Sequence, residues 1–474
     1  MTARQIGLIL GPLVFAITAL TAPPAGMSGE AWMVAGLVIW MASWWMTEAV
    51  PLTATALLPF IWLPLGGVMT AKETASAYYA PILFLLLGGA FLALAIERTG
   101  LHKRLSLAIL KTIGTSGGQT RLLLAFMVSA AFLSMIISNT STTLIMMPMA
   151  LAVISGGAGG PEPEMDTNGL AGALPMGIAF AATIGGLGTI VGSPTNGIAV
   201  QLLDSMIGLE ITFARWMSFG LPIVIVSIPL AAFLISRVQR VAAHPFDVNA
   251  ARKAIDDAAP WSSAEKRLVP IIVIAFLLWM TRQYVAPYLP ENSWTDGTIA
   301  VIASLALFLL PDGTGRPLLI WEEADRAPWG VIMMFGGGLA LAAGMNASGL
   351  AEWLGAALLP LETVPLVLMA LAIVAMVVLI TEFASNVATA SAIIPVVASL
   401  AAALGLGEDA ILIAMPAALA ASWGFILPAG TGPNAIAWAT GRIRIGSLIR
   451  AGLLLDLFGI ALMVGMVWGI AALG

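Results

Sequence analysis

A short polar segment occurs twice in this otherwise apolar chain. Residues 134–143 have the sequence SMIISNTSTT, and residues 381–391 have the sequence TEFASNVATAS. Their Ser-Asn pairs lie 247 residues apart, and so do the prolines that follow them, Pro148 and Pro395. Hydrocarbon does not solvate hydroxyl and amide groups, so in a membrane these side chains must face protein, water or a bound solute. The repeat therefore predicts that two halves of the chain contribute to one polar site.

The composition places the chain in a membrane. Of its 474 residues, 60% are hydrophobic and 9% are charged, and the mean hydropathy is +0.99. A soluble domain carries about 25% charged residues. The absence of cysteine excludes disulfides and thiolate chemistry, and no nucleophile–base pair or metal-ligand cluster stands out. We therefore expect a multi-pass membrane protein that is not an enzyme and has no nucleic-acid partner.

Apolar segments of spanning length surround the polar ones. A transmembrane helix needs about 20 apolar residues. We expect spans near 5–21, 31–47, 51–67, 78–97, 214–236, 268–289, 298–311, 329–352 and 446–472. Each polar segment lies within a pair of shorter apolar stretches, which is typical of a re-entrant hairpin, and is followed by a stretch broken by glycine and proline. The expected fold is an all-α integral membrane protein with about 11 transmembrane helices and two re-entrant hairpins.

The repeat extends beyond the polar segments. Residues 88–101 are matched by residues 337–350 at an offset of 249. The predicted first repeat covers 1–236, with scaffold helices in 1–111, a re-entrant hairpin at 115–156 and a broken helix at 170–203. A cytoplasmic connection at 237–267 leads to the second repeat, 268–474, with scaffold helices in 268–352, a hairpin at 363–403, a broken helix at 410–440 and a last helix at 446–472.

The basic residues set the orientation, because Lys and Arg collect on the cytoplasmic side of a membrane. With a cytoplasmic N-terminus and hairpins that return to their own side, 17 of the 20 basic residues lie inside, and only Lys72, Arg215 and Arg282 lie outside. The C-terminus is then outside. The first hairpin opens to the cytoplasm and the second to the outside, so the halves are inverted. Inverted repeats with broken helices at the midplane are typical of secondary transporters.

The polar segments have the chemistry of sodium sites. Sodium, like calcium, is a hard cation that takes oxygen ligands. Ser134 precedes Ser138 by one helical turn, so we expect both hydroxyls to face one point; Thr381 and Ser385 stand in the same relation. At least two Na+ sites are expected. The first is formed by Ser134, Ser138, Asn139 and the carbonyl of Gly192, and the second by Thr381, Asn386 and the carbonyls of Ala384 and Gly430.

A solute is expected between the two cation sites. No Lys or Arg lies in either polar segment or either broken helix. An anion there would be held by hydroxyls, amides, helix N-termini and the sodium charge, and it would bind after the cation because an unpaired charge at bilayer depth is costly. Glu48 and Glu382 lie near these motifs. Each is interpreted either as a structural acid bonded to backbone at a helix end or as a proton-coupling group.

The motifs resemble those of the divalent anion/sodium symporter family, whose members carry dicarboxylates, citrate or sulfate. The resemblance covers nearly the whole chain and includes residues 47–52 (TEAVPL), 100–104 (GLHKR), 138–140 (SNT), 192–196 (GSPTN) and 381–386 (TEFASN). It implies a homodimer in the bacterial cytoplasmic membrane, with a scaffold domain and a transport domain that moves as an elevator. It also implies that substrate carboxylate is bound by Asn139, Thr140 and Asn386, with Ser193, Pro194, Thr431 and Gly432 completing the pocket.

Two positions depart from the family pattern. Val387 stands in the expected pocket where the first copy has Thr140, which removes one hydroxyl, and Gly432 stands where proline is commoner. The expected substrate is a C4-dicarboxylate such as succinate, malate or fumarate, with citrate or sulfate as alternatives. A sodium-independent dicarboxylate exchanger is the second hypothesis. A membrane enzyme or an ion channel is the third, although candidate catalytic groups are lacking and inverted hairpins favour alternating access over a continuous pore.

Overall fold

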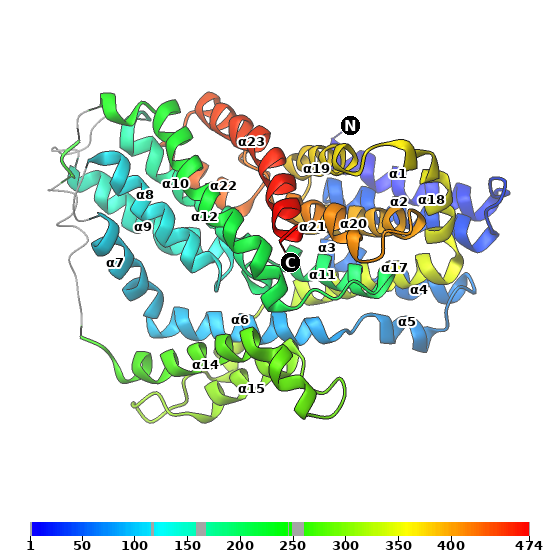
Figure 1. Ribbon diagram of the computed structural model, residues 1–474, viewed down its shortest axis with the longest axis horizontal. Coiled ribbons are helices and arrows are strands. Elements are labelled where there is room, and N and C mark those ends of the chain that lie inside the picture. The colour runs from blue at the N-terminus through cyan, green and yellow to red at the C-terminus, as the bar shows by residue number, and fades with distance from the viewer. Residues whose placement is uncertain (1, 115–117, 158–166, 245, 249–259, 474) are drawn as a thin grey trace.

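The computed structural model describes residues 2–114, 118–157, 167–244, 246–248 and 260–473 (Figure 1). Every regular element in these ranges is a helix, which confirms the all-α class. The first half contains α1 (Ala3–Leu20), α2 (Gly29–Thr47), α3 (Leu52–Thr55), α4 (Leu58–Leu65), α5 (Ala71–Ala77), α6 (Pro81–Thr99), α7 (Leu101–Gly114), α8 (Gln119–Ser134), α9 (Asn139–Gly157), α10 (Gly169–Gly185), α11 (Pro194–Ile207) and α12 (Phe213–Val238). The second contains α14 (Ser263–Val285), α15 (Asp296–Leu309), α16 (Trp321–Ala324), α17 (Trp329–Ser348), α18 (Leu350–Leu358), α19 (Leu366–Phe383), α20 (Asn386–Ala403), α21 (Ile411–Ala420), α22 (Gly432–Ala439) and α23 (Ile445–Ala471).

Nine helices of the described ranges are long and apolar enough to cross a membrane, and three apolar stretches are shorter. The predicted total of 11 spans stays a prediction. The expected span 51–67 is divided into α3 and α4, and Pro59, which lacks a backbone N–H, lies in the first turn of α4. The expected span 298–311 corresponds to α15, which also has 14 residues.

The two halves follow the same order of helices. α6 is capped by Gly100 at φ 78° and α17 by Gly349 at φ 80°, a left-handed conformation that glycine adopts without strain. A one-sided amphipathic helix follows each cap directly, α7 in the first half and α18 in the second. The expected single span 329–352 is therefore two helices. The remaining helices then follow in the same order in each half: a hairpin (α8–α9 and α19–α20), a broken pair (α10–α11 and α21–α22) and a long helix (α12 and α23).

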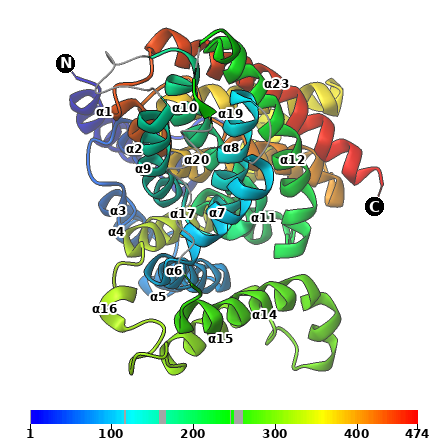
Figure 2. The same ribbon diagram turned by 90° about the vertical axis from the view of Figure 1, so that its left-hand side faces the viewer.

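The halves interlock at the hairpins and broken helices. α11 packs on α20, α12 on α23, and α22 on both α9 and α10, so each contact joins the first half to the second. α6 packs on α15, and α14 on α15, in a layer on one side of the molecule (Figure 2), and α6 also packs on α11. The largest hydrophobic core runs through both halves. This interlocking brings residues some 250 positions apart in the sequence to one place.

Ion pairs connect the loops around the α6–α15 layer. Arg98, at the end of α6, lies 2.5 Å from Asp312 and 3.5 Å from Glu323, which also pairs with Arg316 at 2.6 Å. The Arg98 guanidinium beside Asp312 holds the pKa of that carboxyl well below its usual range. Asp312 belongs to the loop before α16, outside the membrane-spanning helices. The cluster therefore fixes this loop against the end of α6.

Candidate functional site

The first polar segment lies at the break between α8 and α9. α8 ends at Ser134 and α9 begins at Asn139, so residues 135–138 are not helical. The expectation that Ser134 and Ser138 share a helical turn is therefore wrong. Ser138 instead caps α9: its hydroxyl donates to Ser141 Oγ at 2.9 Å and accepts from the Ser141 N–H at 3.1 Å. The partner of Ser134 is Asn139, five residues on, at 2.7 Å.

Asn139 lies at the centre of a cluster of oxygens. One atom of its side-chain amide is 2.7 Å from Ser134 Oγ and 3.2 Å from the carbonyl oxygens of both Gly192 and Ala182. With the amide nitrogen in that place, Asn139 donates to these oxygens. With Oδ1 there, the Ser134 hydroxyl donates to it, and Oδ1, Ser134 Oγ and the two carbonyls bring together four oxygens, the atoms that a hard cation takes as ligands. The cluster is a candidate sodium site, and the orientation of the Asn139 amide decides whether this side chain donates or accepts there.

Glycines allow this close approach. A Cβ on Gly186 would overlap the Asn139 amide, and a Cβ on Gly192 would lie 2.7 Å from the Gly186 carbonyl and 2.9 Å from the Ser134 carbonyl. Asn196 fixes the broken segment by donating to the carbonyls of Gly186 at 2.7 Å and Thr189 at 2.8 Å. The backbone between α10 and α11 is thus pressed against the first hairpin, with the Gly192 carbonyl turned toward Asn139.

The second polar segment repeats this geometry. α19 ends at Phe383 and α20 begins at Asn386. Thr381 Oγ1 donates to Asn386 Oδ1 at 2.9 Å and lies 2.8 Å from the carbonyl of Ala421. The pair therefore corresponds to Ser134 and Asn139, again five residues apart. Ser385 does not face Thr381; its hydroxyl caps α20 by accepting from the Ala388 N–H at 3.2 Å.

Glu382 organises the backbone behind the second cluster. Its carboxylate accepts from the N–H groups of Phe425 at 2.5 Å, of Ile426 at 3.0 Å and of Leu427 at 3.1 Å. The acid is 3% exposed. This matches the structural interpretation, in which a buried acid is bonded to backbone. Glu48 differs, because it is exposed and ends α2 in a left-handed conformation at φ 47°.

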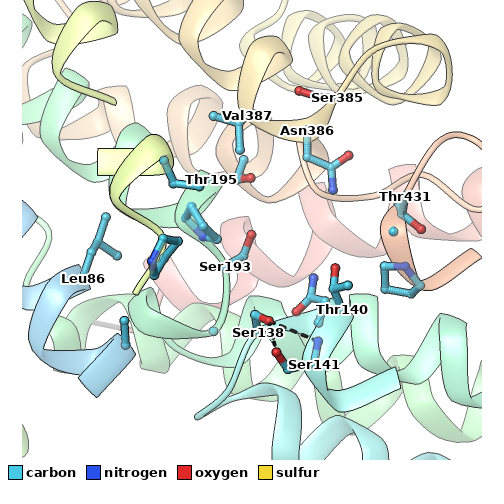
Figure 3. A pocket seen from close by; sticks show the side chains of 18 of the residues that line it. Leu86, Ser138, Thr140, Ser141, Ser193, Thr195, Ser385, Asn386, Val387 and Thr431 are labelled. Carbon is cyan, nitrogen blue, oxygen red and sulfur yellow. Dashed lines mark hydrogen bonds between the residues drawn. The ribbon is translucent and has the colours of Figure 1, made fainter. Parts of the chain in front are cut away.

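The two halves enclose one cavity of about 810 Å³. Figure 3 shows Thr140 and Asn386 on facing sides of it, with Ser193 and Thr431 from the two broken segments. All the sequence-predicted site residues line the cavity except Ser134 and Thr381, which are fully buried behind Asn139 and Asn386. The sequence-predicted residues in the lining are Ser138, Asn139, Thr140, Gly192, Ser193, Pro194, Ala384, Asn386, Val387, Gly430, Thr431 and Gly432.

Four helix N-termini meet at the cavity. Asn139 begins α9, Pro194 begins α11, Asn386 begins α20 and Gly432 begins α22, and each of these residues lines the cavity. Free backbone N–H groups and the helix dipole make an N-terminus attractive to anions. Arg326, in the loop before α17, is the single Lys or Arg among the lining residues, beside the acids Glu48 and Glu97. Neutral groups therefore supply most of the positive potential.

Direct contact joins the halves across the cavity. A Cβ built on Gly432 of the second half would lie 2.6 Å from Thr140 Oγ1 and 3.6 Å from Thr140 Cβ, in the first half. Glycine at this position gives the Thr140 hydroxyl its space. Glycine at position 432, where proline is commoner in the family, thus avoids a steric clash with Thr140.

Several groups at the site were not predicted from the sequence. The carbonyls of Ala182 and Ala421 carry no sequence signal, because any residue supplies a carbonyl. Ser141, Ser385 and Thr195 also line the cavity. All three lie inside the polar motifs, so their position in a motif could have indicated that they line the cavity. Arg326 lies far from the motifs along the chain, and its place at the cavity follows from the fold alone.

The fold and the site together define a class: an all-helical, multi-pass membrane transporter whose two halves close around a polar cavity. The sodium:sulfate symporter transmembrane region family model matches residues 2–473. The chain therefore belongs to this family.

Relatives match over nearly the full length. A protein of Staphylococcus saprophyticus named sodium-dependent dicarboxylate transporter SdcS is 40% identical, over 98% of this chain and 91% of its own. The protein of the same name from Staphylococcus aureus is 38% identical over the same shares. Among solved structures, the Alcanivorax borkumensis YdaH transporter is similar in fold, with a TM-score of 0.57, 18% identity, and coverage of 94% of this chain and 97% of the other.

Proposed function

We propose that this protein is a sodium-coupled symporter of a dianionic C4-dicarboxylate such as succinate, malate or fumarate. The observation that carries the proposal is the cavity, where four helix N-termini and two mirrored oxygen clusters surround one space. The name of the SdcS relatives refers to a dicarboxylate, and the name of the family refers to sulfate. Sulfate and citrate remain the alternative substrates.

Each site residue has a role in this mechanism. Asn139, with Ser134 and the carbonyls of Gly192 and Ala182, would hold one sodium. Asn386, with Thr381 and neighbouring carbonyls, would hold a second. The substrate carboxylates would then lie between them, against the N-termini of α9, α11, α20 and α22. Ser138 stays a proposed sodium ligand through its backbone, because its side-chain hydroxyl is hydrogen-bonded to Ser141.

Coupling follows from charge. Before sodium occupies the clusters, only dipoles offset the negative charge of an anion in the cavity. A bound sodium ion without the anion likewise leaves an unpaired positive charge, which is also costly. Sodium therefore binds first, and the loaded site crosses with its charges paired. If more than two sodium ions accompany a dianion, each net charge contributes about 2.3 kcal/mol of drive per 100 mV.

We place the moving parts at the hairpins and broken helices. These elements, α8–α12 and α19–α23, interlock with one another across the two halves. α1–α7 and α14–α18 would form the scaffold of a homodimer in the bacterial cytoplasmic membrane. The cavity reaches Ala3 at the start of α1, together with Glu48 and Arg326. With the N-terminus in the cytoplasm, the protein is open to the inside in this conformation.

Uptake into proteoliposomes tests the proposal. Labelled succinate should accumulate under an inward sodium gradient and not under choline, with malate and fumarate competing more strongly than citrate or sulfate. Uptake that ignores sodium would reject symport. The sodium-independent exchanger is separated by empty vesicles, which an obligate exchanger cannot fill because it needs counter-substrate inside.

A further inference from the structure

An ion-pair cluster joins the loop before α12 to α14 and α15. Arg282 of α14 lies 2.9 Å from Glu210, in that loop, and 3.3 Å from Asp296, the first residue of α15. Arg282 also donates to the Trp294 carbonyl at 3.2 Å. Asp296 accepts from the N–H of Phe213, the first residue of α12, at 3.0 Å. The proposed transport mechanism uses none of these groups.

Aromatic rings bury the same junction. Phe213 stacks on Trp279 of α14, with ring centroids 4.7 Å apart and an interplanar angle of 25°, and it meets the edge of Phe276 at 5.4 Å. Trp279 Nε1 donates to the Asp296 carbonyl at 3.0 Å, and Asp296 is buried. The start of α12 is therefore held on α14 and α15 by charge, hydrogen bonds and ring packing.

The rest of α12 packs on the proposed moving part. α12 contacts α8, α10 and α23, and Trp216 Nε1 donates to the carbonyl of Leu187, in the first broken segment, at 2.8 Å. A Cβ on Gly220 would overlap the same carbonyl. Because elements packed this closely transmit displacement to one another, a movement of the broken segment must carry α12 with it. The junction with α14 and α15 therefore lies on the boundary between the moving and fixed parts.

The cluster and the cavity mouth lie at opposite ends of α6. A Cβ on Gly297, next to Asp296, would lie 2.5 Å from the carbonyl of Pro81, the first residue of α6. On the same helix the cavity is lined from Leu86 to Glu97. Glu97 is thus displaced along α6 from Pro81 by roughly 24 Å, at about 1.5 Å per residue. The cavity opens on the face of the molecule away from the cluster.

The corresponding place in the first half is open. Counting back from α6 and α17 in chain order, α2 corresponds to α14, and the pair α3–α4 corresponds to α15. The connection between α2 and α3 contains Glu48, which is exposed and lines the cavity. Arg444 and Ile445, at the start of α23, the counterpart of α12, are exposed as well. The inverted repeat is therefore closed at the cluster and open at the cavity mouth.

We propose that Glu210, Arg282 and Asp296 form a clasp that holds the inward-open conformation and must open before the cavity can turn to the other side. When the moving part is displaced, Phe213 separates from Trp279 and the ion pairs separate into water. The side chains of Arg282 and Glu210 are 21% and 63% exposed, so both ions regain hydration and the clasp is reversible. The inference rests on the proposed division into moving and fixed parts, and it depends neither on sodium coupling nor on the substrate.

Hydrogen exchange in a protein locked by a disulfide tests the clasp. A Cβ at Gly338 of α17 lies 3.6 Å from Ser391 Cβ of α20, and disulfides join Cβ atoms at about 3.5–4.5 Å. The variant with Gly338→Cys and Ser391→Cys therefore links the fixed part to the moving part in this conformation. Exchange of the amides at the start of α12, read by mass spectrometry, should slow several-fold on oxidation and recover with dithiothreitol. Ser391→Cys alone, oxidised in the same way, is the control and should show no change.

Asp296→Asn tests the ion pairs. In the unlocked protein, exchange at the start of α12 should become about tenfold faster, the factor expected from the loss of a hydrogen bond to a charged group. The disulfide lock should suppress this increase. Glu210→Gln, at a largely exposed acid, should act in the same direction and replaces Asp296→Asn if that variant does not fold. Glu291→Gln, at an exposed acid between α14 and α15, is the matched control and should leave exchange unchanged.

Equal exchange in the locked and reduced proteins would mean that the junction is a permanent anchor, and would overturn the proposal. An increase in Asp296→Asn that persists in the locked protein would show local fraying instead of clasp opening, and would also count against it. None of these measurements uses sodium or substrate. A protein that shows the expected exchange but takes up succinate without sodium would therefore retain the clasp while refuting symport.

Discussion

Replacing Asn139 with alanine should weaken sodium binding strongly. The side-chain amide lies 2.7 Å from Ser134 Oγ and 3.2 Å from the carbonyls of Gly192 and Ala182, so its oxygen is the centre of the proposed cation cluster. An interaction with a charged group contributes about 1.5–3 kcal/mol, and 1.4 kcal/mol is about a factor of ten in affinity. The sodium concentration for half-maximal succinate uptake should therefore rise roughly 10- to 100-fold.

The assay is sodium-dependent uptake of labelled succinate in proteoliposomes. Asn386→Ala should behave similarly, because Thr381 and Asn386 repeat the geometry at 2.9 Å. At ordinary sodium concentrations both variants should show background uptake while remaining folded in detergent. Asn346→Ala, at an exposed asparagine of α17 away from the cavity, is the matched control and should match the wild type. A half-maximal sodium concentration within about twofold of wild type in Asn139→Ala would refute the assignment of the cluster.

Two further variants test the role of Val387 in the cavity and of Asp312 in the ion pair with Arg98. Val387→Thr adds a hydroxyl to the cavity lining, so the inhibition profile across dicarboxylates, citrate and sulfate should change more than the sodium dependence does; an unchanged profile would count against contact between this residue and substrate. Asp312→Asn should lower the melting temperature at pH 7, because Arg98 depresses the pKa of Asp312 in the folded protein. That stabilisation is present above the ordinary pKa of 3.8 and is lost as the pH falls toward the folded value, so a melting-temperature gap that stays constant down to pH 3 would contradict the ion-pair explanation.

The sequence predicts much of the site because the chain encodes it twice. Matching offsets around Asn139 and Asn386 identify the two hairpins, and Gly100 and Gly349 identify the helix ends before them. Composition indicates a membrane protein, and the lengths of the apolar segments predict that it is helical. These signals survive because a polar residue inside an apolar span is unusual, and because a repeat marks corresponding positions without any knowledge of contacts.

Other features depend on where helices end, which the sequence does not specify to the residue. Ser134 and Ser138 do not share a helical turn, because α8 stops at Ser134. Backbone carbonyls such as that of Ala182 become ligands only through the approach of a glycine-rich segment.

A disulfide across the cavity tests the central claim, that hairpin and broken helix from opposite halves meet at one working site. A Cβ at Gly432 lies 3.6 Å from Thr140 Cβ, and disulfides join Cβ atoms at about 3.5–4.5 Å. The natural chain has no cysteine, so the variant with Thr140→Cys and Gly432→Cys forms no competing bond within its own chain. Thr140→Cys with Gly446→Cys, whose Cβ has no neighbour within 4 Å, is the control.

Mild oxidation should link the first pair and not the control, and the link should stop succinate uptake until dithiothreitol restores it. Failure of the first pair to cross-link, or a cross-linked protein that transports at the rate of its reduced form, would contradict the central claim.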